Sequence, residues 1–330
     1  MNRRYLGFII SVFLQRLSLP GLLFGSLLFA NLLLGDGALA QVGSKSDSRA
    51  IALGLISEVN QAALEAQFRD FVRYVARRLA MGPESEAKVI IAPTAFELVK
   101  HLEQRRVDFY MESAYPTYTI NYVHNAGKTL LRRWKGGIAE YQSLIITKRD
   151  SGVKGLADLR GKTMIFEDSG STSGYLMPKL FLARNGFKLA EKRGFDANAS
   201  PADITYTFAN SRRKLLESVL NKQVAAGAIS DDDYARLDGA SKSDIAVLAQ
   251  TERLPRHLVS VRADLSQQTV ARLHDILIAM HDDPEGQKIL KKTDQTTKFD
   301  RLPGGEEALR KRLLDSFFSP ERTKSSPTGK

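Results

Sequence analysis

The amino-acid sequence predicts an α/β protein built from two similar lobes. Short apolar segments rich in β-branched residues alternate with amphipathic helical segments, first over residues 51–111 and again over residues 163–229. A strand–helix–strand–helix–strand order of this kind favours a parallel sheet with helices on its faces. The chain has 330 residues, and because a compact domain holds about 150 residues, this length also favours two lobes.

The first lobe is expected to begin after a leader and to span residues 41–147. Its apolar strands, each followed by turn residues, are expected at Ile51–Ile56, Lys88–Ala92 and Val107–Met111, with helices at 62–79 and 94–104 between them. Ligands of parallel sheets lie at the carboxyl ends of the strands. The candidate loops are therefore Ser57–Asn60, Pro93–Ala95 and Glu112–Pro116.

The second lobe is expected over residues 148–248, and residues 249–318 are expected to return to the first lobe and add C-terminal helices. Its strands are predicted at Thr163–Phe166, Ile204–Phe208 and Val224–Ile229, its second helix at Arg212–Asn221, and the later helices at Thr269–Asp282, Pro284–Lys291 and Glu306–Phe318. The run Tyr141–Lys148 reads as a further strand, and His257–Val261 is expected to lead back to the first lobe. The polar tail, residues 319–330, is predicted to be disordered.

The pattern of residues 1–40 predicts a secretory signal peptide. Two arginines open the segment, an apolar run covers Leu17–Leu34, and Ala38–Ala40 forms a small-x-small cleavage site. An uncleaved membrane anchor is the alternative, because about 18 apolar residues span a bilayer. Pro20 and the cleavage site favour cleavage. In both cases we expect the bulk of the protein outside the cytoplasm.

The composition narrows the possible functions. The chain has no cysteine and a net charge of +11, so it has no disulfide or thiolate metal site, and its basic surface suits anions. Lysine and arginine are spread along the chain without an RNA-binding signature, so we expect no nucleic-acid partner. Five histidines lack zinc-ligand spacing, and no nucleophile stands beside a base. We therefore predict no metal site, no cofactor and no catalytic residues.

A Ser/Gly-rich loop separates the predicted strand Thr163–Phe166 from a helix that ends near Asn185. The first N–H groups of a helix lack internal partners, and together with the helix dipole they bind anions. Gly170 and Gly174 let the backbone approach a ligand, and the hydroxyls between them donate hydrogen bonds. The loop therefore predicts an oxyanion site that needs no lysine. The alternative is an ordinary surface turn with a serine at the helix N-cap.

The order of several segments resembles the phosphate/phosphite/phosphonate-binding proteins of ABC importers, a family of periplasmic solute-binding proteins. The segments that carry the resemblance are Val107–Phe109, Tyr141–Ile146, Leu156–Lys162, Ser171–Pro178, Leu258–Leu265 and Phe299–Pro303. The resemblance covers roughly residues 50–305, and the run Gly155–Pro178 is its most specific part. It implies a type II periplasmic-binding-protein fold whose two α/β lobes close on a ligand by hinge motion.

The resemblance also implies a function and a set of binding residues. The protein would capture a phosphonate, phosphite or phosphate and, as a monomer, deliver it to an ABC permease in the inner membrane. The alternative is a ligand-sensing subunit that docks on a membrane sensor kinase or receptor. The residues implied to hold the oxyanion are Ser171, Thr172, Ser173, Gly174 and Tyr141, with Ser57, Ser113 and Tyr115 closing the other side.

Three positions depart from the family's pattern. Where members that bind aminoalkyl phosphonates have two acids and a tyrosine, this chain has Arg213, Ala225 and Ala95. An amine would be repelled by Arg213, so we predict a fully anionic ligand and not 2-aminoethylphosphonate. The alternative is that Arg212 and Arg213 are solvated helix residues, since exposed arginine is the common case. Asp231 is a candidate to accept a hydrogen bond from a protonated oxygen of the ligand. The alternative is that Asp231 is an acid in the first turn of the following helix and complements the helix dipole.

Overall fold

The structure is a computed structural model that describes residues 51–79, 86–192 and 200–318. The predicted signal, residues 1–40, and the predicted disordered tail, residues 319–330, lie outside the described residues. Within the described ranges, no helix combines the length and the hydropathy that a membrane crossing requires.

The first lobe contains a six-stranded sheet. In order across the sheet its strands are β14 (Thr296–Asp300), β4 (Gly127–Lys135), β13 (His257–Arg262), β3 (Phe109–Glu112), β1 (Ile51–Ile56) and β2 (Ala87–Ala92). The strands β1, β2 and β3 are parallel, as predicted, whereas β13, β4 and β14 add antiparallel pairs. The sheet is therefore mixed, because the chain returns to it after visiting the second lobe.

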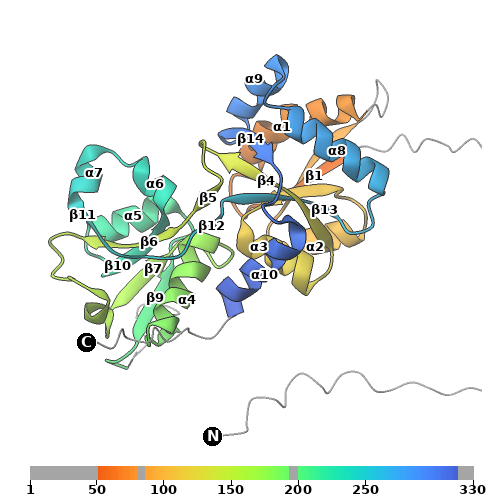
Figure 1. Cartoon of the computed structure of the whole chain (residues 1–330). Helices are drawn as coiled ribbons and strands as arrows, with labels where there is room; N and C mark the ends of the chain where they lie inside the picture. The colour runs from red at the N-terminus through yellow and green to blue at the C-terminus, as the bar shows by residue number, and fades with distance from the viewer. Residues whose placement is uncertain (1–50, 80–85, 193–199, 319–330) are drawn as a thin grey trace, which may run out of the picture. The chain divides into compact units, whose positions relative to one another are not determined.

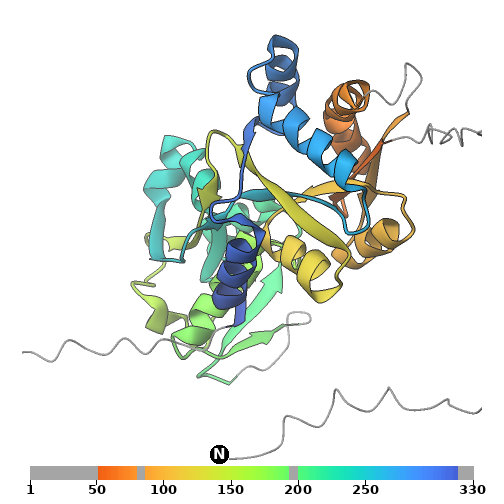
Figure 2. The ribbon, with the colours of Figure 1, turned by 45° about the vertical axis from the view of Figure 1, so that its right-hand side comes forward.

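Helices cover both faces of the first sheet (Figures 1 and 2). On one face, α1 (Gln61–Arg78), α8 (Gln267–Ala279) and α9 (Pro284–Lys292) bury apolar side chains against β1 and β13. Helix α1 turns Phe68, Phe71 and other apolar residues inward at helical spacing. On the other face, α2 (Ala95–Glu103) packs against Tyr110.

The second lobe contains another six-stranded sheet. In order across the sheet its strands are β11 (Ile245–Gln250), β6 (Ser143–Lys148), β10 (Ala226–Ser230), β7 (Thr163–Phe166), β9 (Ile204–Phe208) and β8 (Leu189–Glu191). Helix α4 (Met177–Arg184) packs on one face through Leu182. Helix α5 (Arg212–Leu220) covers the other face through Leu215 and Val219. Strands β7 and β9 have the bounds that the sequence predicts.

The chain crosses between the lobes through two short paired strands, β5 (Glu140–Tyr141) and β12 (Leu254–Pro255). As predicted, β13 then returns to the first sheet. The predicted lobe boundaries need correction, because β6 pairs with β10 and β11 in the second sheet. The first lobe therefore ends before β6 and not at residue 147, and the second lobe extends through β11 to residue 250 instead of 248.

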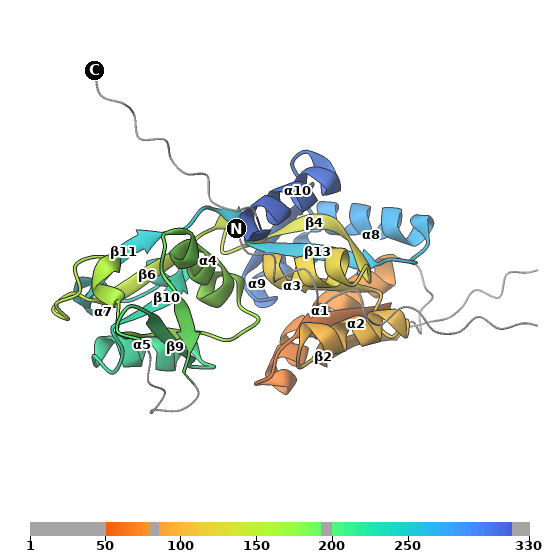
Figure 3. The same cartoon turned by 90° about the horizontal axis from the view of Figure 1, so that it is seen from below.

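Helix α10 (Gly305–Phe318) lies against α3 (Ala114–Tyr118) of the first lobe (Figure 3). Leu313 and Phe317 of α10 share an apolar cluster with Tyr118 of α3 and with Met177 of α4. The C-terminal helix thus contacts both lobes beside the crossing strands.

Replacing Gly286 by alanine is expected to destabilise the first lobe. Gly286 lies in the first turn of α9, where its N–H donates to the capping Asp283 Oδ2 at 3.0 Å. An added Cβ would overlap the backbone carbonyl oxygen of Met280, so α9 would have to move, at a cost of about 2–3 kcal/mol of unfolding free energy. Urea unfolding measures the loss. Gly239→Ala, with open space around the new methyl group, is the control, and equal midpoints for the two variants would contradict the prediction.

Candidate ligand-binding cleft

A cavity of about 550 Å³ lies between the lobes and is lined by residues of both. The three loops predicted at the carboxyl ends of β1, β2 and β3 all contribute, through residues that include Ser57, Thr94 and Ser113. The second lobe contributes the loop after β7, from Glu167 to Ser171, together with Asn210 after β9. The topology of both sheets therefore directs strand ends into one cleft.

The loop after β7 is held by hydrogen bonds of its own side chains. Ser171 caps the helix that follows, since its Oγ accepts the Gly174 N–H at 3.0 Å and donates to Glu167 Oε2 at 3.2 Å. Asp168 Oδ1 accepts the Gly170 N–H at 2.8 Å. A side chain at Gly174 would lie 2.7 Å from Glu167 Cβ, so glycine is needed for this close approach. The helix begins with a π-helical turn, Thr172–Leu176, before α4.

Five of the predicted binding residues meet at the floor of the cleft. The Thr172 hydroxyl donates to Ser113 Oγ at 2.9 Å and accepts the backbone N–H of Tyr115 at 2.9 Å. The Tyr141 hydroxyl is within hydrogen-bonding reach of the Thr172 and Ser173 side chains. Ser113 and Tyr115 line the cavity, whereas Thr172, Ser173 and Tyr141 are buried directly behind them. Hydrogen-bond donors from both lobes and from a crossing strand therefore converge.

The charged groups that line the cavity are acidic. Glu58, Glu112, Glu167 and Asp168 line it, and no lysine or arginine is among its described lining residues. Burial raises the pKa of Glu112 to about 7, against the hydrogen bonds from the N–H groups of Ile56 and Ser113. Burial likewise raises the pKa values of Glu167 and Asp168. A positive charge that enters the cavity would stabilise the ionised form of these carboxyl groups.

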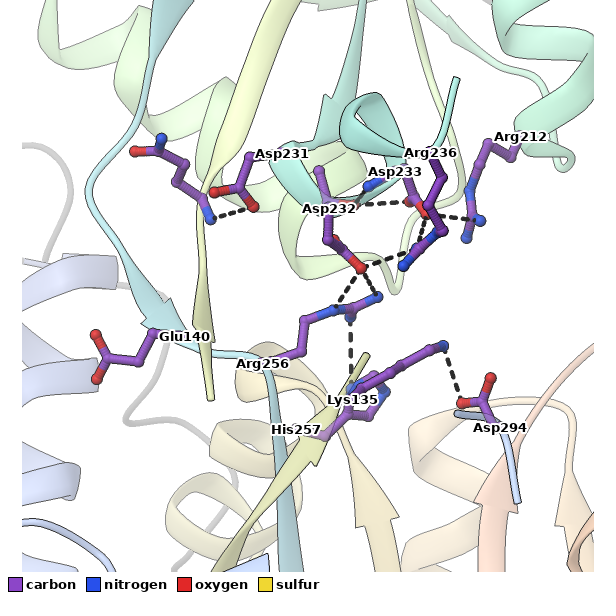
Figure 4. A network of polar contacts seen from close by, with 12 residues as sticks. Lys135, Glu140, Arg212, Asp231, Asp232, Asp233, Arg236, Arg256, His257 and Asp294 are labelled. Carbon is purple, nitrogen blue, oxygen red and sulfur yellow. Dashed lines mark hydrogen bonds and ion pairs between the residues drawn. The ribbon is translucent and has the colours of Figure 1, made fainter. Parts of the chain in front are cut away.

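A network of ion pairs backs the second-lobe side of the cleft (Figure 4). Arg212 is 2.8 Å from Asp233 Oδ1 and 3.8 Å from Glu167 Oε1, which places a guanidinium beside a lining carboxylate. Arg236 bridges Asp232 and Asp233. The network thus neutralises the acids of α6 (Asp231–Ala235), which follows the carboxyl end of β10.

Two residues expected to set ligand charge lie away from the cavity. The Arg213 side chain is 84% exposed and is 3.6 Å from Glu217 one turn along α5. Ala225 directly precedes β10, at the amino end of that strand, whereas the cleft lies at the carboxyl ends of the strands. Ala225 lines a separate small cavity with Lys162 and Lys222. The prediction that Arg213 faces the ligand is therefore wrong, and Arg213 is not placed to repel an amine-bearing ligand. Ala95 does line the cleft.

Asp231 is also outside the cavity lining. Its Oδ1 accepts the Gln142 N–H at 3.3 Å and its Oδ2 is 2.8 Å from Arg253. Ser230 is the N-cap of α6, and Asp231 is the first of three acids in its first turn. The structure therefore supports the helix-dipole role of Asp231 over the ligand role.

The sequence analysis places Glu58 and Glu112 in candidate loops, but it names none of the four lining acids, Glu58, Glu112, Glu167 and Asp168, as a binding residue. A usable signal was present, because Glu112 ends β3 and Glu167 directly follows β7. Both positions lie at the carboxyl ends of strands, where ligands bind in sheets of this kind.

Several known proteins are similar to this chain. The phosphate-import protein PhnD of Mycolicibacterium smegmatis is 26% identical over 184 residues, which are 55% of this chain and 55% of that protein. The chain therefore spans about half the length of this curated relative. XAC2383 from Xanthomonas citri, solved with ATP bound, has a TM-score of 0.75 at 25% identity and covers 82% of this chain and 97% of its own. PhnD1 from Prochlorococcus marinus, in complex with methylphosphonate, has a TM-score of 0.62 at 15% identity over 82% of this chain and 97% of its own.

The structural neighbours share the type II periplasmic-binding-protein fold of two α/β lobes with a cleft between them. The family model for the periplasmic substrate-binding protein of phosphonate ABC transporters matches residues 53–302. That match covers both lobes and every loop of the cleft. Members of this family are substrate-binding proteins and not enzymes. The chain belongs to the family of phosphonate-type periplasmic substrate-binding proteins of ABC transporters.

Proposed function

We propose that this protein captures a small phosphonate in its cleft by closing the two lobes and delivers it to the permease of an ABC importer in the inner membrane. The observation that carries the proposal is the convergence of donors from both lobes, in which Thr172 reaches Ser113 Oγ and the Tyr115 N–H. A monomer suffices for this role, because the cleft is lined by one chain.

These donors suit a phosphonate oxygen. A modest opening of the lobes separates Thr172 from Ser113 and frees both hydroxyls, together with the Tyr115 N–H, for an oxyanion between them. Hydrogen bonds to a charged oxygen are roughly twice as strong as neutral ones, and exclusion of water by the closed lobes strengthens them further. The exchange of hydroxyl–hydroxyl bonds for hydroxyl–oxyanion bonds therefore favours the closed, ligand-bound state.

The acidic lining adds a second requirement, a positive charge on the ligand. A bare anion would be repelled by the lining carboxylates, whereas an ammonium group pairs with them. Glu112 and Asp168 lie on opposite lobes and both line the cavity, so an ammonium between them also holds the lobes together. We therefore propose an aminoalkyl phosphonate, which replaces the expectation of a fully anionic ligand. ATP, the ligand of the XAC2383 structure, carries several negative charges and is disfavoured by the same acids.

Thermal unfolding of the chain without its predicted signal tests this proposal. The compounds are 2-aminoethylphosphonate, methylphosphonate, phosphite, phosphate and ATP, each added alone. A ligand at about 100 times its Kd stabilises the folded state by about 2.7 kcal/mol, which raises the Tm by several degrees. We expect the largest shift with 2-aminoethylphosphonate, a smaller one with methylphosphonate, and none with ATP. The absence of any shift with all five compounds would contradict the proposed function.

A further inference from the structure

Arg256 and Tyr141 are stacked where the chain crosses between the lobes. Tyr141 of β5 pairs with Leu254 of β12, and the Arg256 N–H donates to the Ala139 carbonyl oxygen at 2.7 Å. The Arg256 guanidinium lies over the Tyr141 ring, with its carbon 4.5 Å from the ring centre. The two residues are only 6% and 1% exposed. A buried cation–π contact of this kind attracts the guanidinium to the ring face and fixes the orientation of the ring.

Asp232 holds Arg256 in place from the second lobe (Figure 4). The Nε and Nη2 atoms of Arg256 each lie 3.2 Å from Asp232 Oδ2. Asp232 also accepts a hydrogen bond from Arg236 at 2.9 Å. Burial alone would raise the pKa of Asp232, but the charge of Arg256 and the hydrogen bonds from Ser230 and Arg236 hold that pKa below its ordinary value. Asp232 thus stays ionised and the pair stays intact.

The position of Arg256 matters because the cavity lining itself has no basic residue in the described part of the chain. Arg256 lies on one face of the ring whose hydroxyl reaches Thr172 and Ser173. Its neighbour His257 adds no charge, since burial and the nearby cations lower the pKa of His257 well below its usual value. Burial raises the pKa of the Tyr141 hydroxyl, and the charge of Arg256 against the ring opposes that rise. Arg256 therefore keeps the Tyr141 hydroxyl a stronger hydrogen-bond donor than burial alone would leave it.

We infer that Arg256 is a positioning residue for ligand binding, which clamps the Tyr141 ring so that the Tyr141 hydroxyl points at the oxyanion between the lobes. This inference rests on the proposed function, since it assigns Arg256 a role at the same site. A purely structural role for the Arg256–Asp232 pair would stabilise the crossing segment without affecting affinity. The two roles are separated by measuring ligand affinity and unfolding independently.

The test uses Arg256→Met combined with Asp232→Asn, which removes the ion pair without leaving a lone buried charge. Isothermal titration with 2-aminoethylphosphonate and with methylphosphonate gives Kd, and circular dichroism checks folding. We expect the double variant to bind about tenfold or more weakly, consistent with the loss of a buried cation–π contact. Lys222→Met with Asp150→Asn, which removes an exposed ion pair of 2.9 Å in the second lobe, is the control and should leave Kd within about twofold.

Tyr141→Phe decides whether Arg256 acts through the tyrosine hydroxyl. If it does, adding Tyr141→Phe to the double variant weakens binding no further than Tyr141→Phe alone, within about twofold. Losses that multiply would overturn the positioning role, as would an unchanged Kd in the folded double variant. Arg256→Lys, which keeps the charge and loses the planar stack, covers the case of poor folding and is also expected to weaken binding. If wild type binds neither compound, the proposed function itself fails, and this inference falls with it.

Discussion

Replacing Ser171 and Thr172 together by alanine is expected to weaken binding of 2-aminoethylphosphonate at least about 100-fold, because two hydrogen bonds to a charged group are lost and each is worth about 1.5–3 kcal/mol. Thr172 links the second lobe to Ser113 and to the Tyr115 N–H, and Ser171 lines the cavity while capping its helix. The variant therefore loses ligand contacts from the lobe that supplies the loop. Isothermal titration measures the loss.

The same double variant also loses a helix cap, so its stability needs a matched control. Ser266→Ala removes the cap of α8, where Ser266 Oγ accepts the Thr269 N–H at 3.2 Å, and Ser266 is not among the residues that line the cleft. Loss of an N-cap costs about 1 kcal/mol, and we expect Ser266→Ala to be destabilised by about that amount. The cleft variant should lose more, because Thr172 also gives up its hydrogen bonds with Ser113 and the Tyr115 N–H. Only the cleft variant should lose affinity. Equal Kd values for wild type and the cleft variant would exclude the Ser171 loop as the oxyanion site.

Much of the fold follows from local sequence, because the central strands of both sheets are short apolar runs that match a fully buried strand. Strands β1, β7 and β9 have the bounds that these runs predict. Strand β4 was missed, since it carries lysines and arginines that usually indicate solvent. Arg133 of β4 is buried because partners far along the chain satisfy its guanidinium, with Asp294 at 2.9 Å and the Thr296 hydroxyl accepting at 2.7 Å. A long-range ion pair of this kind leaves no local signal.

The residues of the candidate site were predictable where the topology of the sheets alone fixes their position. The carboxyl ends of parallel strands converge, so the loops at Ser57, Pro93 and Ser113 were placed in the cleft correctly. The orientation of Arg213 was not predictable, because the side chains of Arg212 and Arg213 leave the helix axis in directions about 100° apart. Arg212 is beside Glu167, whereas Arg213 is in solvent. Neighbouring residues on a helix point in different directions, so sequence alone does not show which of them faces a ligand.

The pH dependence of stability and binding should report on Glu112, whose pKa burial raises to about 7. A carboxyl whose folded-state pKa exceeds its unfolded value stabilises the protein fully below the unfolded pKa and loses that contribution as the pH rises through the folded pKa. Raising the pH from about 5 to about 8 should therefore lower the free energy of unfolding by roughly 1–3 kcal/mol through this group. Glu112→Gln keeps the oxygen that accepts the Ile56 N–H at 2.7 Å and should flatten this part of the pH profile.

Ligand binding should respond to the same proton with the opposite sign. Deprotonated Glu112 pairs with an ammonium, so affinity for 2-aminoethylphosphonate should increase by up to about tenfold between about pH 6 and pH 8, because an ion of opposite charge favours the ionised carboxylate. The phosphonate also titrates in this range, and its contribution cancels in the ratio of wild-type to Glu112→Gln affinities at each pH. Glu217→Gln, on the outer surface of α5, should keep the wild-type profile. A ratio that stays constant with pH would show that the ammonium does not contact Glu112, and the charge assigned to the ligand would then have to pair with Glu58, Glu167 or Asp168.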